Sequence, residues 1–305
     1  MRTAFITALI EQARLHPELF LVVGDLGYSV IEPFAQEFPD RFLNAGVAEQ
    51  NMTGIAAGLA SEGYHVFTYS IANFPTLRCL EQIRNDICYH GLPVTVAAVG
   101  GGMAYGNLGY SHHAVQDIAI MRTLPGIRVY APGDPGETRE CIAWQVAHPG
   151  PAYLRLGKAG EPLLHETRGI NSGPLRVREG GGRIALVTTG GILKVAADAS
   201  EILAKEGIVV DVFSVPLLKP VSPNYFGVLA SFQALITLEE HVAEGGLASV
   251  LRENLRAGPE LISLHVDEFV AHCVGSQDYL RDKAGIGAAR VTEVVRGIAG
   301  KIFVS

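Results

Sequence analysis

Short apolar runs alternate with helical patterns along most of the chain, and this alternation constrains the fold more than any other feature. In the first half, the runs rich in Val, Ile and Tyr are expected to be strands at 19–26, 65–70, 93–100, 126–133 and 151–156. Helices are expected between them, roughly at 47–62, 75–89, 115–123 and 134–147. Continuous apolar runs are typical of parallel strands covered by helices on both faces. The pattern predicts a doubly wound α/β domain.

A second α/β unit follows a break in the pattern. The segment 157–182 is rich in Gly, Pro and charge, which is typical of an interdomain linker. Further strands are expected at 183–190, 208–218, 234–240 and 262–267, and the last helix carries a stripe of Val291, Val294, Val295 and Ile298. We therefore expect an α/β fold of two doubly wound domains with mainly parallel sheets: a first domain at 1–160, a linker at 161–182 and a second domain at 183–305.

Composition excludes several classes of protein. The net charge is -7 and no basic run is present, which argues against a nucleic-acid partner. The cysteines, Cys79, Cys88, Cys141 and Cys273, are scattered and have no metal-ligand spacing. The first twenty residues resemble an amphipathic helix rather than a signal peptide, and no apolar run is long enough to span a bilayer. We expect a cytoplasmic protein with reduced thiols and no membrane contact.

The stretch 41–70 contains the most informative residue, Glu49. A helix is expected to begin near Val47, which places Glu49 in its first turn, where the helix dipole favours a carboxylate. A purely structural role at a helix start is therefore one explanation. Burial among apolar neighbours would instead favour a protonated carboxyl that donates a hydrogen bond. Those neighbours are Ala45, Val47, Ala48, Ile55 and Ala56.

Ordered motifs over nearly the whole chain add to this interpretation. The sequence GVAEQNMTGIAAGLASEG (46–63) resembles the cofactor-glutamate region of the transketolase and deoxyxylulose-phosphate synthase family. Further stretches resemble the same family in the same order, at 78–94, 106–137, 151–158 and 186–249. The resemblance implies a transketolase-like transferase that depends on thiamine diphosphate. In this family the glutamate hydrogen-bonds a ring nitrogen of the cofactor's aminopyrimidine, which makes Glu49 a catalytic and cofactor-binding residue here.

The resemblance also implies which residues hold the cofactor ring. Aromatic residues after the glutamate helix usually stack on it, and Phe74 is the best match, with Tyr69 and Ile71 as companions. Aromatic residues are also common in buried strands, so a role in the core is the alternative explanation for these residues.

Substrate contacts are implied in the loop GNLGYSHH and at the end of the first domain. His112 occupies the place of the family's substrate-hydroxyl histidine and is expected to be catalytic and substrate-binding. His113 stands where a glutamine is common, and Arg155 matches an arginine that binds the sugar phosphate. Without the resemblance, the histidines would be taken for surface residues and Arg155 for a salt bridge at a strand end.

The chain lacks the motif with which the family holds metal and diphosphate. That motif is Gly-Asp-Gly with a downstream Asn, and neither GDLG (24–27) nor GDPG (133–136) fits it. We therefore expect no metal ligand in this chain. The diphosphate and Mg²⁺ should be held by an N-terminal transketolase subunit, in a heterotetramer in which this chain also self-associates.

Two further departures concern the sugar. The acidic pair usual in the substrate loop is replaced by Asn107 and Leu108, so Leu108 would face the substrate where a carboxylate usually reads a hydroxyl. Gly100 and Val23 replace a histidine and a serine of the phosphate site, which leaves Arg155. A phosphate site with fewer charge-assisted partners is weaker, unless the partner subunit supplies them. The predicted reaction is transfer of a two-carbon ketol unit from a ketose to an aldehyde, with a non-standard or unphosphorylated sugar.

Two other functions remain open. The β-subunit of a 2-oxo acid dehydrogenase decarboxylase component shares the domain plan, but its donor would be a 2-oxo acid that releases carbon dioxide. The stretches SHHAVQD and LRLGK look more like transketolase. A catalytically silent scaffold subunit is the other alternative, and the joint presence of Glu49, His112 and Arg155 counts against it.

Overall fold

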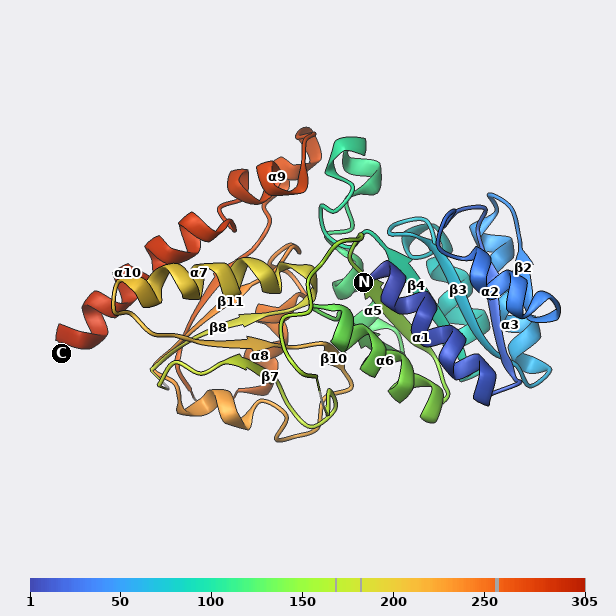
Figure 1. The fold of residues 1–305 in the computed structure, drawn as a ribbon, viewed down its shortest axis with the longest axis horizontal. Coiled ribbons are helices and arrows are strands. Elements are labelled where there is room, and N and C mark those ends of the chain that lie inside the picture. The colour runs from blue at the N-terminus through green and yellow to red at the C-terminus, as the bar shows by residue number, and fades with distance from the viewer. Residues whose placement is uncertain (168, 182, 256–257, 305) are drawn as a thin grey trace.

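The computed structural model describes residues 1–167, 169–181, 183–255 and 258–304, and its two halves each contain one sheet (Figure 1). The first sheet has seven strands in the order β10-β5-β6-β4-β3-β1-β2. Apart from β10, its strands are β1 (Leu19–Val23), β2 (Phe42–Asn44), β3 (His65–Ile71), β4 (Val94–Val99), β5 (Arg128–Tyr130) and β6 (Ala152–Leu156). The helices of this half are α1 (Arg2–Leu15), α2 (Glu32–Glu37), α3 (Glu49–Ser61), α4 (Leu80–Gln82), α5 (Asp117–Thr123) and α6 (Pro135–Ala147).

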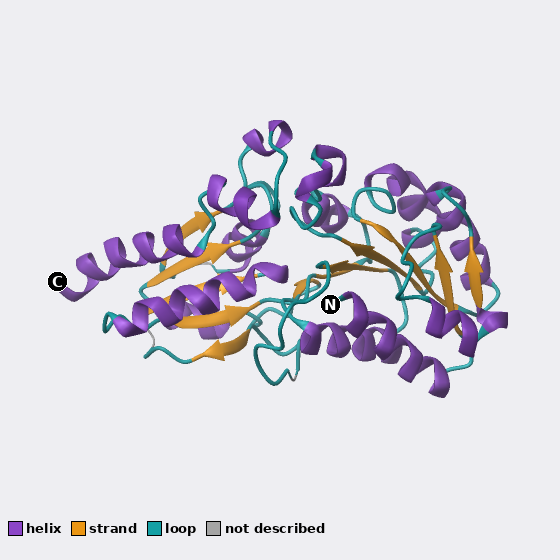
Figure 2. Cartoon of the chain, turned by 45° about the horizontal axis from the view of Figure 1, so that its top comes forward, coloured by secondary structure: helices purple, strands orange, loops and turns teal. Residues whose placement is uncertain are grey.

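The second sheet has five strands in the order β12-β11-β8-β9-β7. They are β7 (Leu175–Arg178), β8 (Ile184–Thr188), β9 (Asp211–Ser214), β11 (Ala234–Leu238) and β12 (Glu260–Leu264). The helices of this half are α7 (Leu193–Lys205), α8 (Leu247–Asn254), α9 (Gln277–Lys283) and α10 (Ala288–Val304). Helices cover both faces of the sheets (Figure 2). The predicted α/β fold with mainly parallel sheets is confirmed.

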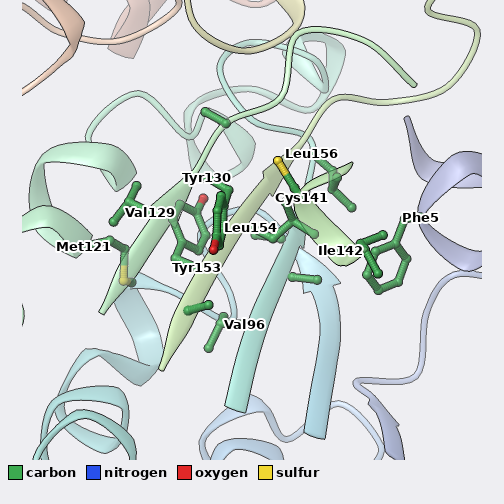
Figure 3. Close-up of a cluster of buried hydrophobic side chains, with 14 of the residues drawn as sticks. Phe5, Val96, Met121, Val129, Tyr130, Cys141, Ile142, Tyr153, Leu154 and Leu156 are labelled. Atoms are coloured by element: carbon green, nitrogen blue, oxygen red, sulfur yellow. The ribbon is translucent and has the colours of Figure 1, made fainter. Parts of the chain in front are cut away.

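Buried parallel strands explain the continuous apolar runs of the sequence. Every residue of β1, β4 and β6 is buried, because helices pack on both faces of the first sheet. Side chains from α1, α5 and α6 close on β4, β5 and β6 in this core, where Phe5, Met121 and Ile142 meet the strands (Figure 3). No described helix has the length and apolar character needed to cross a bilayer.

The prediction of one strand at 208–218 is wrong. The chain divides there at Pro216, so that β9 (Asp211–Ser214) belongs to the second sheet and β10 (Leu217–Lys219) crosses to the first, antiparallel to β5. Proline has no N–H to donate and interrupts a ladder, while its carbonyl accepts a hydrogen bond from the Ala131 N–H at 2.8 Å. As a result, the C-terminal half contributes a strand to the first sheet and ties the two domains together.

Two short strands have no expected counterpart. β2 is a partly exposed edge strand, and β7 pairs antiparallel with β9 inside the segment 161–182 that composition assigns to a linker. Half-buried and exposed residues alternate along β7, so it has no continuous apolar run. Because Arg176 and Arg178 are charged, the composition of this strand resembles that of a loop.

Candidate active site

Glu49 begins α3 and lies over the carboxyl ends of the central strands. Its side chain is only 2% exposed. Gly24, directly after β1, leaves room for it: a Cβ at Gly24 would lie 3.5 Å from both Met52 Sδ and Ser70 Oγ, and 3.7 Å from Glu49 Cγ. The carboxyl edge of a doubly wound sheet is where such folds bind ligands. The expected burial of Glu49 in the first turn of a helix is therefore present at a ligand-binding edge.

Arg78 is the partner of Glu49, and the sequence pattern does not single it out. Its Nη1 donates to Glu49 Oε2 at 2.7 Å, and its side chain is 48% exposed. Its guanidinium carbon also lies 4.7 Å from the centre of the Phe74 ring. Gln50 Nε2 donates to the Arg78 carbonyl at 3.1 Å and fastens this turn to α3. The sequence offers one signal, an arginine close to the expected aromatic residues.

Phe74 and His112 continue the line that starts at Glu49. The turn after β3 presents a half-buried Phe74, and it includes Ala72 with a positive φ of 32°. The Phe74 ring meets the His112 ring edge-on, with centroids 5.2 Å apart. Burial lowers the pKa of His112, so the neutral imidazole is favoured at pH 7. Residues from α3, from the turn after β3 and from the loop at 106–112 thus form one array.

Tyr69 and Ile71 are placed differently from Phe74. Tyr69 is fully buried and stacks on Phe5 of α1, with centroids 5.5 Å apart. Successive side chains of a strand point to opposite faces, and Ser70 is the one beside Gly24 and Glu49. Tyr69 therefore points away from Glu49 into the core. Ile71 is half-buried at the end of β3 and pairs with Val99.

The loop that contains His112 is fixed to the second domain. The Gly275 N–H donates to the Gly106 carbonyl at 3.2 Å, and Asn73 Nδ2 donates to the His113 carbonyl at 2.8 Å. His113 is fully buried, and burial lowers its pKa. Leu108, in contrast, is 56% exposed in this chain. The loop therefore presents an apolar side chain outwards while its histidines are sheltered.

Arg155 lies in a buried network between the domains. Its side chain is 4% exposed, and its Nε donates to Asp117 Oδ2 at 2.7 Å. Its Nη2 donates to the carbonyls of Ala114 and Glu240 at 2.7 and 2.9 Å, and the Tyr153 hydroxyl donates to Asp117 at 2.6 Å. Most of the hydrogen-bond donors of the Arg155 guanidinium are therefore satisfied within the chain. The structure does not join Arg155 to the array of Glu49, Phe74 and His112.

Val23 and Gly100 stand where the family has ligands for the sugar phosphate, and other side chains occupy the space at both positions. Val23 is fully buried in β1. A Cβ at Gly100 would collide with the ring of Tyr105, so this ring takes the room that a larger side chain would need. Lys158 Nζ lies 5.5 Å from the centre of the same ring.

Asp25 has an uncommon backbone conformation that sequence reasoning does not single out. It follows Gly24 at the end of β1 and has a positive φ of 53°, which is uncommon for a residue other than glycine. Asn44 Nδ2 and the Tyr28 hydroxyl both donate to Asp25 Oδ1 at 2.9 Å, and these bonds lower its pKa. The sequence GDLG does not fit a metal motif, but an aspartate directly after a strand end is the usable signal.

The residues around Glu49 fit one half of a thiamine diphosphate site. A buried carboxyl and a half-buried aromatic ring are the groups that an aminopyrimidine requires for a hydrogen bond and for stacking. Among the described ranges, the one group of side chains that could hold a metal ion is Asp134, Glu137 and His165, away from this array on α6 and the interdomain segment. Those carboxylates already accept hydrogen bonds from the main chain at Glu137, Leu164 and Gly133.

Comparisons with known proteins agree with this fold. Residues 1–160 match the family model for the transketolase pyrimidine-binding domain, and residues 173–291 match the model for the transketolase C-terminal domain. The chain therefore belongs to the transketolase family, whose members depend on thiamine diphosphate. It corresponds to the C-terminal chain of a split transketolase, a transferase that requires a partner subunit.

Some of the relatives are separate subunits of about the same length. The chain is 36% identical over 251 residues to one of the subunits of the apulose-4-phosphate transketolase of Actinobacillus succinogenes, covering 82% of this chain and 80% of that one. It is 31% identical over 306 residues to the 6-deoxy-6-sulfo-D-fructose transketolase subunit SqwH of a Clostridium species, covering 98% and 94%. A solved structure described as a split gene transketolase, inactive beta4 tetramer, is 33% identical, with a TM-score of 0.85 over 97% of this chain and 96% of that chain.

Proposed function

We propose that this chain supplies the pyrimidine-binding half of a thiamine diphosphate site and that an N-terminal transketolase subunit supplies the diphosphate and Mg²⁺ half. The carrying observation is Glu49, buried at the start of α3 and joined through Arg78 to Phe74 and His112. The assembled enzyme would move a two-carbon ketol unit from a ketose to an aldehyde in the cytoplasm. We further propose that the assembled enzyme is a heterotetramer. The two domains of this chain are proposed to span residues 1–160 and 183–305.

Each residue has a defined task in this proposal. When bound, the cofactor supplies a thiazolium electron sink for carbon–carbon cleavage. Glu49, which is 2% exposed at the start of α3, would hydrogen-bond the aminopyrimidine through its carboxyl group. Phe74 would stack on the ring, with Ile71 at the strand end and Tyr69 supporting it from the core. His112, favoured as a neutral imidazole, would hydrogen-bond a substrate hydroxyl.

The sugar is proposed to be a modified ketose and aldehyde rather than an ordinary pentose phosphate. Tyr105 fills the space beside Gly100, Val23 is buried, and Leu108 presents an apolar group. The relatives named for apulose 4-phosphate and 6-deoxy-6-sulfo-D-fructose support a modified sugar. His113 and Arg155 are proposed to support the substrate loop from behind. Arg155 would bind the sugar's phosphate only through the guanidinium edge that the chain leaves open.

Catalytic efficiency of the reconstituted enzyme tests this choice. Ribose 5-phosphate should be a poorer acceptor than at least one free, deoxy or otherwise modified aldehyde. An apolar side chain that faces a substrate hydroxyl leaves that hydroxyl unpaired, at a cost of about 1–3 kcal/mol. A preference of about tenfold or more for ribose 5-phosphate over all the modified aldehydes, equal to about 1.4 kcal/mol, would contradict the proposal.

A further inference from the structure

The turn after β3 is fixed by hydrogen bonds within its own main chain. The Phe74 N–H donates to the Ile71 carbonyl at 2.9 Å, and the Arg78 N–H donates to the Asn73 carbonyl at 3.4 Å. Arg78 is also the residue whose guanidinium pairs with Glu49. The main chain at Asn73 is therefore held in place relative to both the Phe74 ring and the Glu49 carboxyl group.

The side chain of Asn73 reaches from this turn to the loop at 106–113. Its Nδ2 donates to the Ser111 carbonyl at 3.3 Å and to the His113 carbonyl at 2.8 Å. Both partners are acceptors, so the amide nitrogen, which is the donor end of the group, must face them. The two bonded carbonyls belong to the residues directly before and after His112. One amide group thus holds the main chain on both sides of this histidine.

The ring of His112 has contacts of its own. Its Nδ1 lies 3.0 Å from the Ser111 hydroxyl oxygen, and its edge meets the Phe74 ring. Its Nε2 makes no hydrogen bond to any residue that the structure describes. Because Nδ1 is occupied, Nε2 is the ring nitrogen that remains available for a ligand.

The loop is anchored to the second domain at one end and to the first domain at the other. The Gly275 N–H donates to the Gly106 carbonyl at 3.2 Å, and Gly102 and Ala114 exchange two main-chain hydrogen bonds at 2.8 and 2.9 Å. Asn73 contacts the segment between these ends. Ordering a partly exposed segment costs conformational entropy, and two hydrogen bonds from a rigid turn offset that cost before a substrate arrives.

We propose that Asn73 is a positioning residue that sets the place of His112 relative to a cofactor ring stacked on Phe74. The inference rests on the proposed function, in which His112 hydrogen-bonds a substrate hydroxyl. Asn73 and Phe74 are neighbours in one turn, so the group that stacks on the cofactor and the group that holds the histidine keep a constant separation. Asn73 acts through His112, and a misplacement of about 1 Å can lower a reaction rate about 10²-fold.

Hydrogen exchange of the loop at 106–113 in the reconstituted complex, followed by mass spectrometry, tests whether Asn73 holds it. In Asn73→Ala the loop should exchange at least about tenfold faster than in the unaltered complex. Asn73→Asp keeps the shape of the side chain but loses both N–H groups, and should behave in the same way. Asn254→Ala is the matched control, because Asn254 Nδ2 also donates to a main-chain carbonyl, that of Val250 at 2.8 Å. Unchanged exchange in both Asn73 variants overturns the proposal.

A double-mutant cycle with His112→Ala tests whether the effect on the reaction passes through the histidine. Catalytic efficiency is measured with ribose 5-phosphate and with free ribose as acceptors. Asn73→Ala alone should lower it at least about tenfold, with affinity for thiamine diphosphate changed less than about twofold. Once His112 has been removed, Asn73→Ala should lower efficiency by less than about twofold more.

The outcomes of the cycle separate this inference from the proposed function. Losses that simply add, or a loss explained by weaker cofactor binding, overturn the positioning role of Asn73 and leave the role of His112 intact. Full efficiency in His112→Ala contradicts the proposed role of the histidine itself, and the positioning role with it. Neither result affects the assignment of Glu49, which is tested by cofactor binding.

Discussion

At the carboxyl edge of the first sheet, Glu49 is 2% exposed while its partner Arg78 is 48% exposed, whereas between the domains Arg155 and its partner Asp117 are 4% and 0% exposed. The interdomain pair is enclosed by further groups of the same chain, including Tyr153 and the Ala114 carbonyl. At the sheet edge, Arg78 forms an ion pair with Glu49 and lies over the Phe74 ring, and the rest of its side chain faces solvent. The difference supports the proposal that another molecule completes the edge, whereas the interdomain charges are satisfied within this chain.

The largest expected effect is at Glu49. In the enzyme reconstituted with its partner, Glu49→Gln should lower turnover by about 10²–10⁴, the range for a positioned acid–base group. Glu62→Gln, at the exposed far end of the same helix, is the matched control and should leave turnover unchanged. Near-normal turnover of an intact Glu49→Gln complex would mean that Glu49 is only a helix-start carboxylate.

Asp117→Asn tests the enclosed side of the comparison. Removing one partner of a buried ion pair leaves an uncompensated charge, so we expect a loss of about 3–5 kcal/mol in the free energy of unfolding. Chemical denaturation measures it, with Asp40→Asn on an exposed turn as the control. A loss below about 1 kcal/mol would show that the interdomain network is not what stabilises the chain.

How far the sequence could predict these two regions depends on how local the signal is. Glu49, Phe74 and His112 lie in continuous motifs, and the structure places them in one array. Arg155 contacts Asp117, which is 38 positions away in the sequence, and Glu240, which is 85 positions away. No local sequence pattern predicts contacts over such separations. Arg78 was missed for the same reason, because its partner is 29 positions away.

The errors in the strands have a similar physical origin. Apolar runs predicted the buried strands, but β7 is half-exposed and has no such run. The run at 208–218 is apolar almost throughout, so little in its hydropathy separates the part in the second sheet from the part that crosses to the first. Pro216 was the one available signal, since proline interrupts a ladder.

His165 gives the interdomain contact a pH dependence. Its Nε2 lies 2.8 Å from Glu137 Oε1, and Glu137 also accepts from the Ser214 hydroxyl of the second sheet at 3.0 Å. Burial opposes protonation of His165, but the hydrogen bond and charge of Glu137 outweigh burial and raise its pKa. Protonated His165 therefore stabilises the folded chain below about pH 6.5, the ordinary value, and this contribution is lost as pH rises through the raised pKa.

The corresponding experiment compares unfolding of the unaltered chain and His165→Gln at several pH values. The unaltered chain should be more stable by an amount on the order of 1–2 kcal/mol at about pH 6, with the difference shrinking towards about pH 9. His90→Gln, at an exposed position, should show no such trend. A difference that grows with pH would contradict the assigned role.

Arg78→Met should have the smallest effect on stability. A half-exposed ion pair contributes about 0.2–1 kcal/mol, so unfolding should change by no more than that. Because the aminopyrimidine and Arg78 would use the same carboxyl group, the variant complex should bind thiamine diphosphate up to about fivefold more tightly, the equivalent of ~1 kcal/mol. Weaker cofactor binding would identify Arg78 as a cofactor contact rather than a competitor.

The most direct test of an edge completed by another molecule is cofactor binding by this chain with and without its partner. Isothermal titration with thiamine diphosphate and Mg²⁺ should show no tight binding to the chain alone. The equimolar complex with the N-terminal subunit should bind thiamine diphosphate and Mg²⁺ and should turn over substrate. Binding of the intact cofactor at micromolar concentration by the lone chain, together with turnover, would contradict the account.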